Sequence, residues 1–125
     1  MHAVNNYLEA ALQQVHEHLP DDMLKGDEVK KVYKGYISAF GTIVKQSGLL
    51  PAAVLFGKEG GNDRSEGNKK HITDLLLRIL HEKGHATDAA DFIVLARRYP
   101  GLRREVLHAA VALKLALRTR KFTSK

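Results

Sequence analysis

Apolar residues recur at helical spacing along the first half of the chain. One run covers residues 4–19 and stops at Pro20, and a second covers residues 27–46 and stops at Gly48. Spacings of three and four residues place apolar side chains on one helix face, and proline or glycine marks the end. The pattern therefore predicts two amphipathic helices, the second beginning at Asp27.

The second half is also predicted to be helical. Residues 49–56 are nearly all apolar, which predicts a short helix buried nearly all round. Further helices are predicted from Ile72 to Gly84, over residues 89–99 with Thr87 or Asp88 as the cap, and over residues 102–121. Four glycines in residues 57–68 predict an exposed loop, and no segment alternates like a strand. The expected fold is all-α: a single-domain bundle of five or six helices over residues 1–125.

Composition narrows the class of protein. The chain has no cysteine, which excludes disulfides, thiolate nucleophiles and cysteine-bound zinc. No apolar stretch approaches the roughly 20 residues that cross a bilayer. Residues 1–12 contain no Lys or Arg, so the basic start of a secretory signal is missing. These features predict a cytoplasmic protein with no membrane partner.

Charge is distributed unevenly along the chain, which has 20 Lys and Arg against 14 Asp and Glu. Residues 1–24 contain four acidic residues and no Lys or Arg, whereas residues 97–125 contain nine Lys and Arg and a single acidic residue, Glu105. A locally basic surface is typical of a protein that binds a polyanion. Opposite charge in the two segments also predicts a molecule with oppositely charged ends. Copies of the chain would then attract one another head to tail.

Basic residues form stripes on the predicted helices. On the second helix, Ser38 and Gly41 share a side with three lysines, and four arginines surround the Pro100-Gly101 turn. Such groups can reach adjacent phosphates while the apolar faces stay in the core. Because the aromatic residues fall on core-facing positions, contact with the nucleic-acid backbone is expected. The candidate nucleic-acid-binding residues are Lys30, Lys34, Lys45, Arg97, Arg98, Arg103, Arg104, Lys114, Arg118 and Lys121.

Two other functions are compatible with local patterns. His81, Glu82 and His85 match H-E-x-x-H, which predicts a zinc-dependent hydrolase if one helix carries both histidines. Gly84 is better interpreted as the residue after the helix end, which argues against that site. The last two helices could instead form a helix-turn-helix DNA-binding regulator. No catalytic residue, metal or cofactor is predicted.

Two blocks of sequence resemble a known family. The first runs from Tyr33 to Lys58 and includes Ile43-Val44-x-x-Ser47-Gly48-Leu49-Leu50 and Ala53-Val54-Leu55-Phe56-Gly57-Lys58; the second runs from Glu105 to Lys114. Both are similar to segments of the small helical subunit of the Cmr complex, the type III-B CRISPR RNA-guided effector, in which it is the fifth Cmr protein. Ser47 stands where the family usually has Asn, and Gly57 where it has Ser.

The resemblance implies a non-catalytic subunit with a role in antiviral defence. It implies guide RNA and target RNA as ligands, and other Cmr subunits and stacked copies of the chain as partners. The RNA-binding positions that it implies are among the basic residues of the two helical stripes and the arginine cluster.

Overall fold

The structure is a computed structural model that describes residues 2–57 and 67–124. Helices dominate it, which confirms the predicted all-α class. The α-helices are α1 (His2–Glu17), α2 (Val32–Ser47), α3 (Leu49–Gly57), α4 (Lys70–Glu82), α5 (Phe92–Arg98) and α6 (Arg103–Leu117). Two 3₁₀ turns, η1 (Asp21–Met23) and η2 (Pro100–Leu102), and two strands, β1 (Leu24–Lys25) and β2 (Glu28–Val29), complete the described elements.

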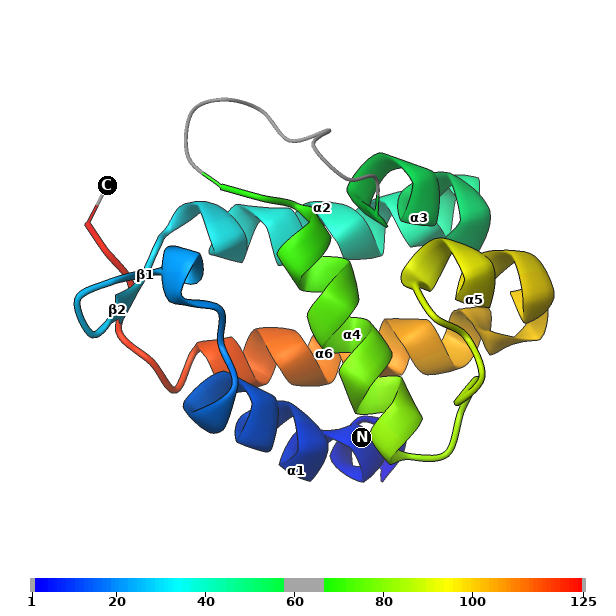
Figure 1. Cartoon of the computed structure of the whole chain (residues 1–125), viewed down its shortest axis with the longest axis horizontal. Helices are drawn as coiled ribbons and strands as arrows, with labels where there is room; N and C mark the ends of the chain where they lie inside the picture. The colour runs from blue at the N-terminus through cyan, green and yellow to red at the C-terminus, as the bar shows by residue number, and fades with distance from the viewer. Residues whose placement is uncertain (1, 58–66, 125) are drawn as a thin grey trace.

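Helix α6 is the centre of the bundle. It packs against α1, α2 and α4, and α4 crosses in front of it in the view of Figure 1. Alanine and leucine fill most of its buried positions, so neighbouring helices can approach closely. Helices α3 and α5 contact each other and cover one end of the bundle.

Three phenylalanines join α2, α3 and α5. The ring of Phe40 is fully buried, with centroids 5.4 Å from Phe56 and 5.7 Å from Phe92, in edge-to-face arrangements. This geometry brings the positive ring edge to the negative ring face. The aromatic cluster thus attaches both short helices to the middle of α2.

The α4 helix ends where the sequence predicts. Gly84 has a φ of +84°, and the amides of Gly84 and His85 donate to the carbonyls of His81 and Leu80, at 3.0 and 2.9 Å. These two bonds form a Schellman motif, in which glycine adopts the left-handed conformation without strain. The helix therefore stops before His85.

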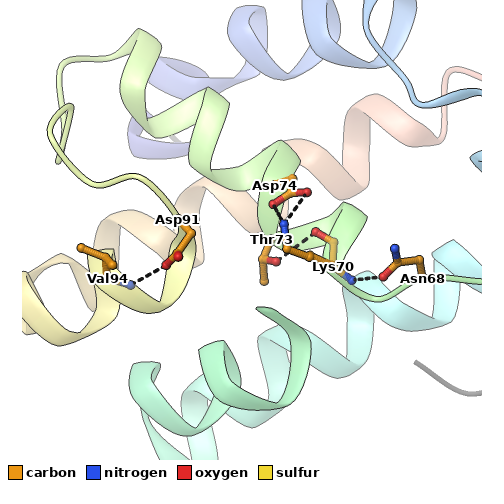
Figure 2. Close-up of polar contacts among 6 residues, drawn as sticks. All are labelled: Asn68, Lys70, Thr73, Asp74, Asp91 and Val94. Carbon is orange, nitrogen blue, oxygen red and sulfur yellow. Dashed lines mark hydrogen bonds and ion pairs between the residues drawn. The ribbon is translucent and has the colours of Figure 1, made fainter. Parts of the chain in front are cut away.

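The cap of α5 differs from the prediction. Asp91 Oδ1 accepts a hydrogen bond of 2.8 Å from the amide of Val94, so Asp91 is the cap (Figure 2). Thr87 and Asp88 lie several residues before the helix, in a turn that follows α4. The prediction was wrong because capping residue types recur along this segment, and only the chain path selects one.

Polar contacts also order the start of α4, as Figure 2 shows. Asn68 Oδ1 accepts from the Lys70 amide at 2.9 Å, and Lys70 Nζ lies 3.1 Å from Asp74 one turn later. The amide of Asn68 donates to Tyr33 Oη at 3.0 Å. Gly67 packs so closely on Tyr33 that an added Cβ would lie 3.0 Å from the ring. Most of the predicted 57–68 loop, residues 58–66, lies outside the described residues.

The start of the second helix was predicted wrongly. Residues 27–31 are not helical: Glu28–Val29 pairs antiparallel with Leu24–Lys25, and Val29 forms a parallel bridge with Phe122. Val29 is fully buried, and a buried apolar residue at this position fits a helix and a strand equally well. Pairing with the distant C-terminal segment decides its conformation, and such short strands leave no alternating pattern in the sequence.

Helix α3 is not buried nearly all round, which corrects a second prediction. Ala52, Ala53 and Phe56 face the core, but Leu50, Val54 and Leu55 are 42, 49 and 58% exposed. Apolar composition alone cannot distinguish a helix in the core from one at its edge.

Among the described residues, no helix has both the length and the apolar character needed to span a membrane.

Candidate nucleic-acid interface

Helices α2 and α6 run antiparallel and are connected at both ends. Arg103, at the start of α6, donates a hydrogen bond of 2.8 Å from Nη2 to the carbonyl of Lys45, near the end of α2. At the other end, Lys34 Nζ lies 5.9 Å from the ring centroid of Phe122. The last carbonyls of a helix lack partners within it, so Arg103 acts partly as a C-terminal cap of α2.

A groove of about 210 Å³ lies between these two helices. Helix α2 contributes mostly small or polar residues together with Ile37, and α6 contributes mostly aliphatic ones. A Cβ added at Gly41 would have no neighbour within 4 Å, so the α2 wall is open at this point. The residues that line the groove are Ile37, Ser38, Gly41, Thr42, Lys45, Leu107, Ala110, Val111 and Lys114.

Lys45 and Lys114 give the groove its positive charge, one from each helix. Lys45 is exposed and Lys114 is half-buried, and neither ammonium group forms an ion pair within the part of the chain that the structure describes. No carboxylate lines the groove in the part of the chain that the structure describes. Unpaired charge of one sign beside apolar walls concentrates the electrostatic field and attracts an anion.

The two predicted basic stripes extend this groove. Lys34 lies one turn before Ser38 on α2, and Arg118 follows Lys114 by one turn at the end of α6. Both are exposed. The structure therefore brings Lys34, Lys45, Lys114 and Arg118 to the two sides of one antiparallel helix pair. Thr42, Leu107 and Val111 also line the groove but were not predicted, although Leu107 and Val111 share helical spacing with Lys114.

The predicted arginine cluster is divided between two places. Arg103 turns toward α2, whereas Arg97 and Arg98 line a separate, shallow hollow of about 340 Å³ on α5. Arg98 Nη1 is 3.6 Å from Asp88, whose pKa is lowered by a hydrogen bond from Tyr99 and, to a smaller extent, by Arg98. Arg104 is exposed at the start of α6.

Lys30 and Lys121 lie outside the helices to which they were assigned. Lys30 follows β2 in the chain, and α6 ends at Leu117, four residues before Lys121. Lys121 Nζ instead pairs with Glu28 at 3.3 Å. Their positions depend on contact between the hairpin and the C-terminal segment, which helical periodicity does not predict.

The acidic and basic segments are not at opposite ends of the molecule, contrary to the sequence-based prediction. Helix α1 packs along α6 more extensively than any other helix does. Arg120 Nη1 donates to the carbonyl of Val15 at 3.1 Å, and His16 Nε2 lies 2.8 Å from Thr119 Oγ1. Segments far apart in sequence are thus neighbours, so the charge difference along the chain does not give the molecule two oppositely charged ends.

The H-E-x-x-H segment does not have the geometry of a zinc site. Helix α4 ends at Glu82, so His85 lies beyond it, and His85 Nε2 is 3.1 Å from Tyr7 Oη. Within residues 2–57 and 67–124, no three His, Asp or Glu side chains are arranged to hold a metal. These positions do not support the hydrolase alternative.

The packing of α6 argues against the helix-turn-helix alternative. A recognition helix must enter the major groove of DNA with one face free. Helix α6 is instead covered by α1, α2 and α4, and its exposed basic residues lie beside α2 and at its ends. This arrangement favours contact between a nucleic acid and the surface shared by α2 and α6.

Comparison with known families gives a match over nearly the whole chain. The model of a CRISPR-associated protein family, Cas_Cmr5, matches residues 4–119. The chain belongs to the Cas_Cmr5 family. It is therefore a Cmr5 small subunit of the type III-B CRISPR complex, as the two resembling blocks predicted. Searches of curated proteins and of solved structures found no match.

The Cas_Cmr5 match spans all six α-helices apart from the first residues of α1, including both helices of the groove. Cas_Cmr5 is a family of structural subunits of the Cmr complex. The features described above can therefore be interpreted as those of a subunit within a larger assembly.

Proposed function

We propose that this chain is a non-catalytic subunit that helps to hold guide and target RNA in the Cmr complex, with the α2/α6 groove as its main RNA contact. The observation that carries the proposal is that Lys45 and Lys114, on facing helices of one groove, have no ion-pair partner among residues 2–57 and 67–124. Lys34 and Arg118 continue this basic path. Arg97, Arg98 and Arg104 form a second, peripheral contact.

The chemistry of this surface fits the RNA backbone. Lysine and arginine side chains bind phosphates without regard to base identity, which suits a subunit that must accept any guide sequence. Arg103 contributes partly through the fold, since its bond to the Lys45 carbonyl holds α6 beside α2. Lys121 is assigned a minor role because its ammonium group is already paired with Glu28. Lys30 is assigned a minor role because it follows β2 and does not line the groove.

Reversing both groove charges tests the proposal. The double variant Lys45→Glu/Lys114→Glu is expected to bind unstructured RNA about tenfold more weakly at low salt, because two attractive phosphate interactions become repulsive. The slope of log affinity against log salt should fall by roughly 0.7 for each phosphate that is no longer neutralised. Fluorescence anisotropy of labelled RNA over a salt series measures both quantities.

A matched control makes the same change of net charge elsewhere. Lys25 on β1 and Lys83 after α4 are both exposed and lie outside the groove lining. The variant Lys25→Glu/Lys83→Glu is expected to keep most of the RNA affinity. An equal decrease in affinity in the two variants, or no decrease in the groove variant, would contradict the assignment of the groove.

We also propose that the exposed apolar face of α3 contacts another Cmr subunit or a stacked copy. Leu50, Val54 and Leu55 account for three of the four large hydrophobic side chains that are exposed in the described structure. Exposed apolar surface gathered on one short helix is typical of a protein interface.

Changing Leu50 and Leu55 to serine together should reduce recovery of the chain with the other Cmr subunits in a pull-down, because the apolar side chains that would be buried between subunits are removed. Binding of the isolated chain to RNA should not change. Ala39→Ser, at an exposed position on α2, is the control. Unchanged recovery of the double variant would rule out α3 as a subunit interface.

A further inference from the structure

We propose that the α2/α6 groove receives one base of the bound RNA, while Lys45 and Lys114 contact the flanking phosphates. This inference rests on the proposed RNA-binding function and adds a base subsite to it. It assigns a role to the apolar part of the groove, which phosphate contacts alone leave unused.

The size and lining of the groove suit a single base. Pockets for drug-sized ligands have volumes of about 300–1,000 Å³, whereas this groove has about 210 Å³. Leu107, Ala110 and Val111 provide an aliphatic wall, and Val111 is 42% exposed. Bases that leave a stack are held between aromatic or apolar side chains in other nucleic-acid-binding proteins.

The opposite wall allows close approach. Gly41 lies in the middle of α2 with open space where a side chain would be, and Ser38 is one turn before Thr42 on the same wall. The Thr42 hydroxyl donates to the carbonyl of Ser38 at 3.2 Å, whereas no partner of the Ser38 hydroxyl lies among the described residues. Ser38 Oγ is therefore available to a polar edge of a base, and it can donate or accept.

Charge distinguishes a base from an apolar protein side chain as the occupant. Each wall of the groove carries one ammonium group, and among the described residues neither group has an ion-pair partner and no carboxylate lines the groove. An apolar side chain would neutralise neither charge. A nucleotide brings its own phosphates on both sides of the base, so it complements the lysines and the aliphatic wall together.

The experiment compares two strands of equal length, oligouridine RNA and a ribose-phosphate strand without bases. The wild-type chain should bind oligouridine about fivefold more tightly at low salt, which is roughly what removing about 40 Å² of apolar base surface from water contributes. Gly41→Leu should remove this preference, because the leucine side chain fills the base subsite, and should keep the affinity for the abasic strand. Leucine has a higher helix propensity than glycine, so misfolding of α2 would not explain the lost preference for oligouridine.

Gly35→Leu is the matched control. Gly35 is also on α2 with open space around it, but it does not line the groove, so the preference for oligouridine should persist. Equal binding of both strands by the wild type, or a preference that survives Gly41→Leu, would overturn the base subsite. Failure of Gly41→Leu to bind another Cmr subunit, with unchanged RNA affinity, would show a protein occupant instead.

Failure of the base subsite can be separated from failure of the proposed function. If Lys45→Glu/Lys114→Glu weakens binding of the abasic strand and the wild type shows no preference for bases, only the subsite is wrong. If charge reversal has no effect on either strand, the RNA-binding role of the groove is wrong as well.

Discussion

Replacing Phe40 by alanine is expected to lower the free energy of unfolding by about 3–5 kcal/mol, the usual cost of removing a buried phenylalanine side chain. Phe40 is fully buried and contacts the rings of Phe56 and Phe92, so the cavity would open where α2, α3 and α5 meet. The short α3 and α5 helices cannot collapse into it without giving up their other packing. Urea unfolding followed by circular dichroism measures the change.

Leu55→Ala provides the comparison, because it removes a large apolar side chain from α3 at a position that is 58% exposed. Its effect on unfolding should stay within about 0.5 kcal/mol. If Phe40→Ala had an effect as small as this, the aromatic cluster would not be the structural junction that its ring contacts indicate.

Tyr7→Phe is expected to destabilise the chain by about 2 kcal/mol, because it deletes a hydrogen bond to a charged acceptor and leaves the acceptor partly buried. Tyr7 Oη donates to Glu105 Oε1 at 2.5 Å and lies 3.1 Å from His85 Nε2, so the hydroxyl connects α1, α6 and the segment after α4. Since its single proton goes to Glu105, Tyr7 accepts from His85. Burial, reinforced by Glu105, raises the pKa of Tyr7, which keeps the phenol protonated as a donor.

The surface pair Tyr99 and Asp88 has the same chemistry, with a bond of 2.6 Å between exposed groups. Tyr99→Phe should therefore destabilise less than Tyr7→Phe in the same urea experiment, because water replaces the missing hydroxyl as a partner. Equal effects of the two substitutions would mean that burial of the Tyr7 network contributes nothing.

Much of the helical architecture could be predicted from periodicity. The first helix and the end of α4 at Gly84 follow directly from apolar spacing and glycine. The errors lie where a distant segment decides the outcome. Val29 becomes a strand residue because Phe122 pairs with it, and α6 ends at Leu117 because the chain then turns back toward β2.

The candidate site was predictable in part. Helical spacing placed Lys34, Ser38, Gly41 and Lys45 on one side of α2, and three of these four line the groove. It could not show that Lys114 lies across from them, nor that Arg103 is engaged by the carbonyl of Lys45. Periodicity describes one helix at a time, whereas a groove needs two.

The sequence by itself determined the all-α class, the family and the basic faces of two helices, because these depend on residues close together in the chain. Only the tertiary structure decided which basic residues share a surface. Antiparallel packing of α2 and α6 brought Lys45 and Lys114 to one groove, and separate packing of α1 along α6 placed the acidic N-terminal segment beside the basic C-terminal one. Charge sums along a chain are independent of its path, but the electrostatic field that a ligand meets depends on distances in space.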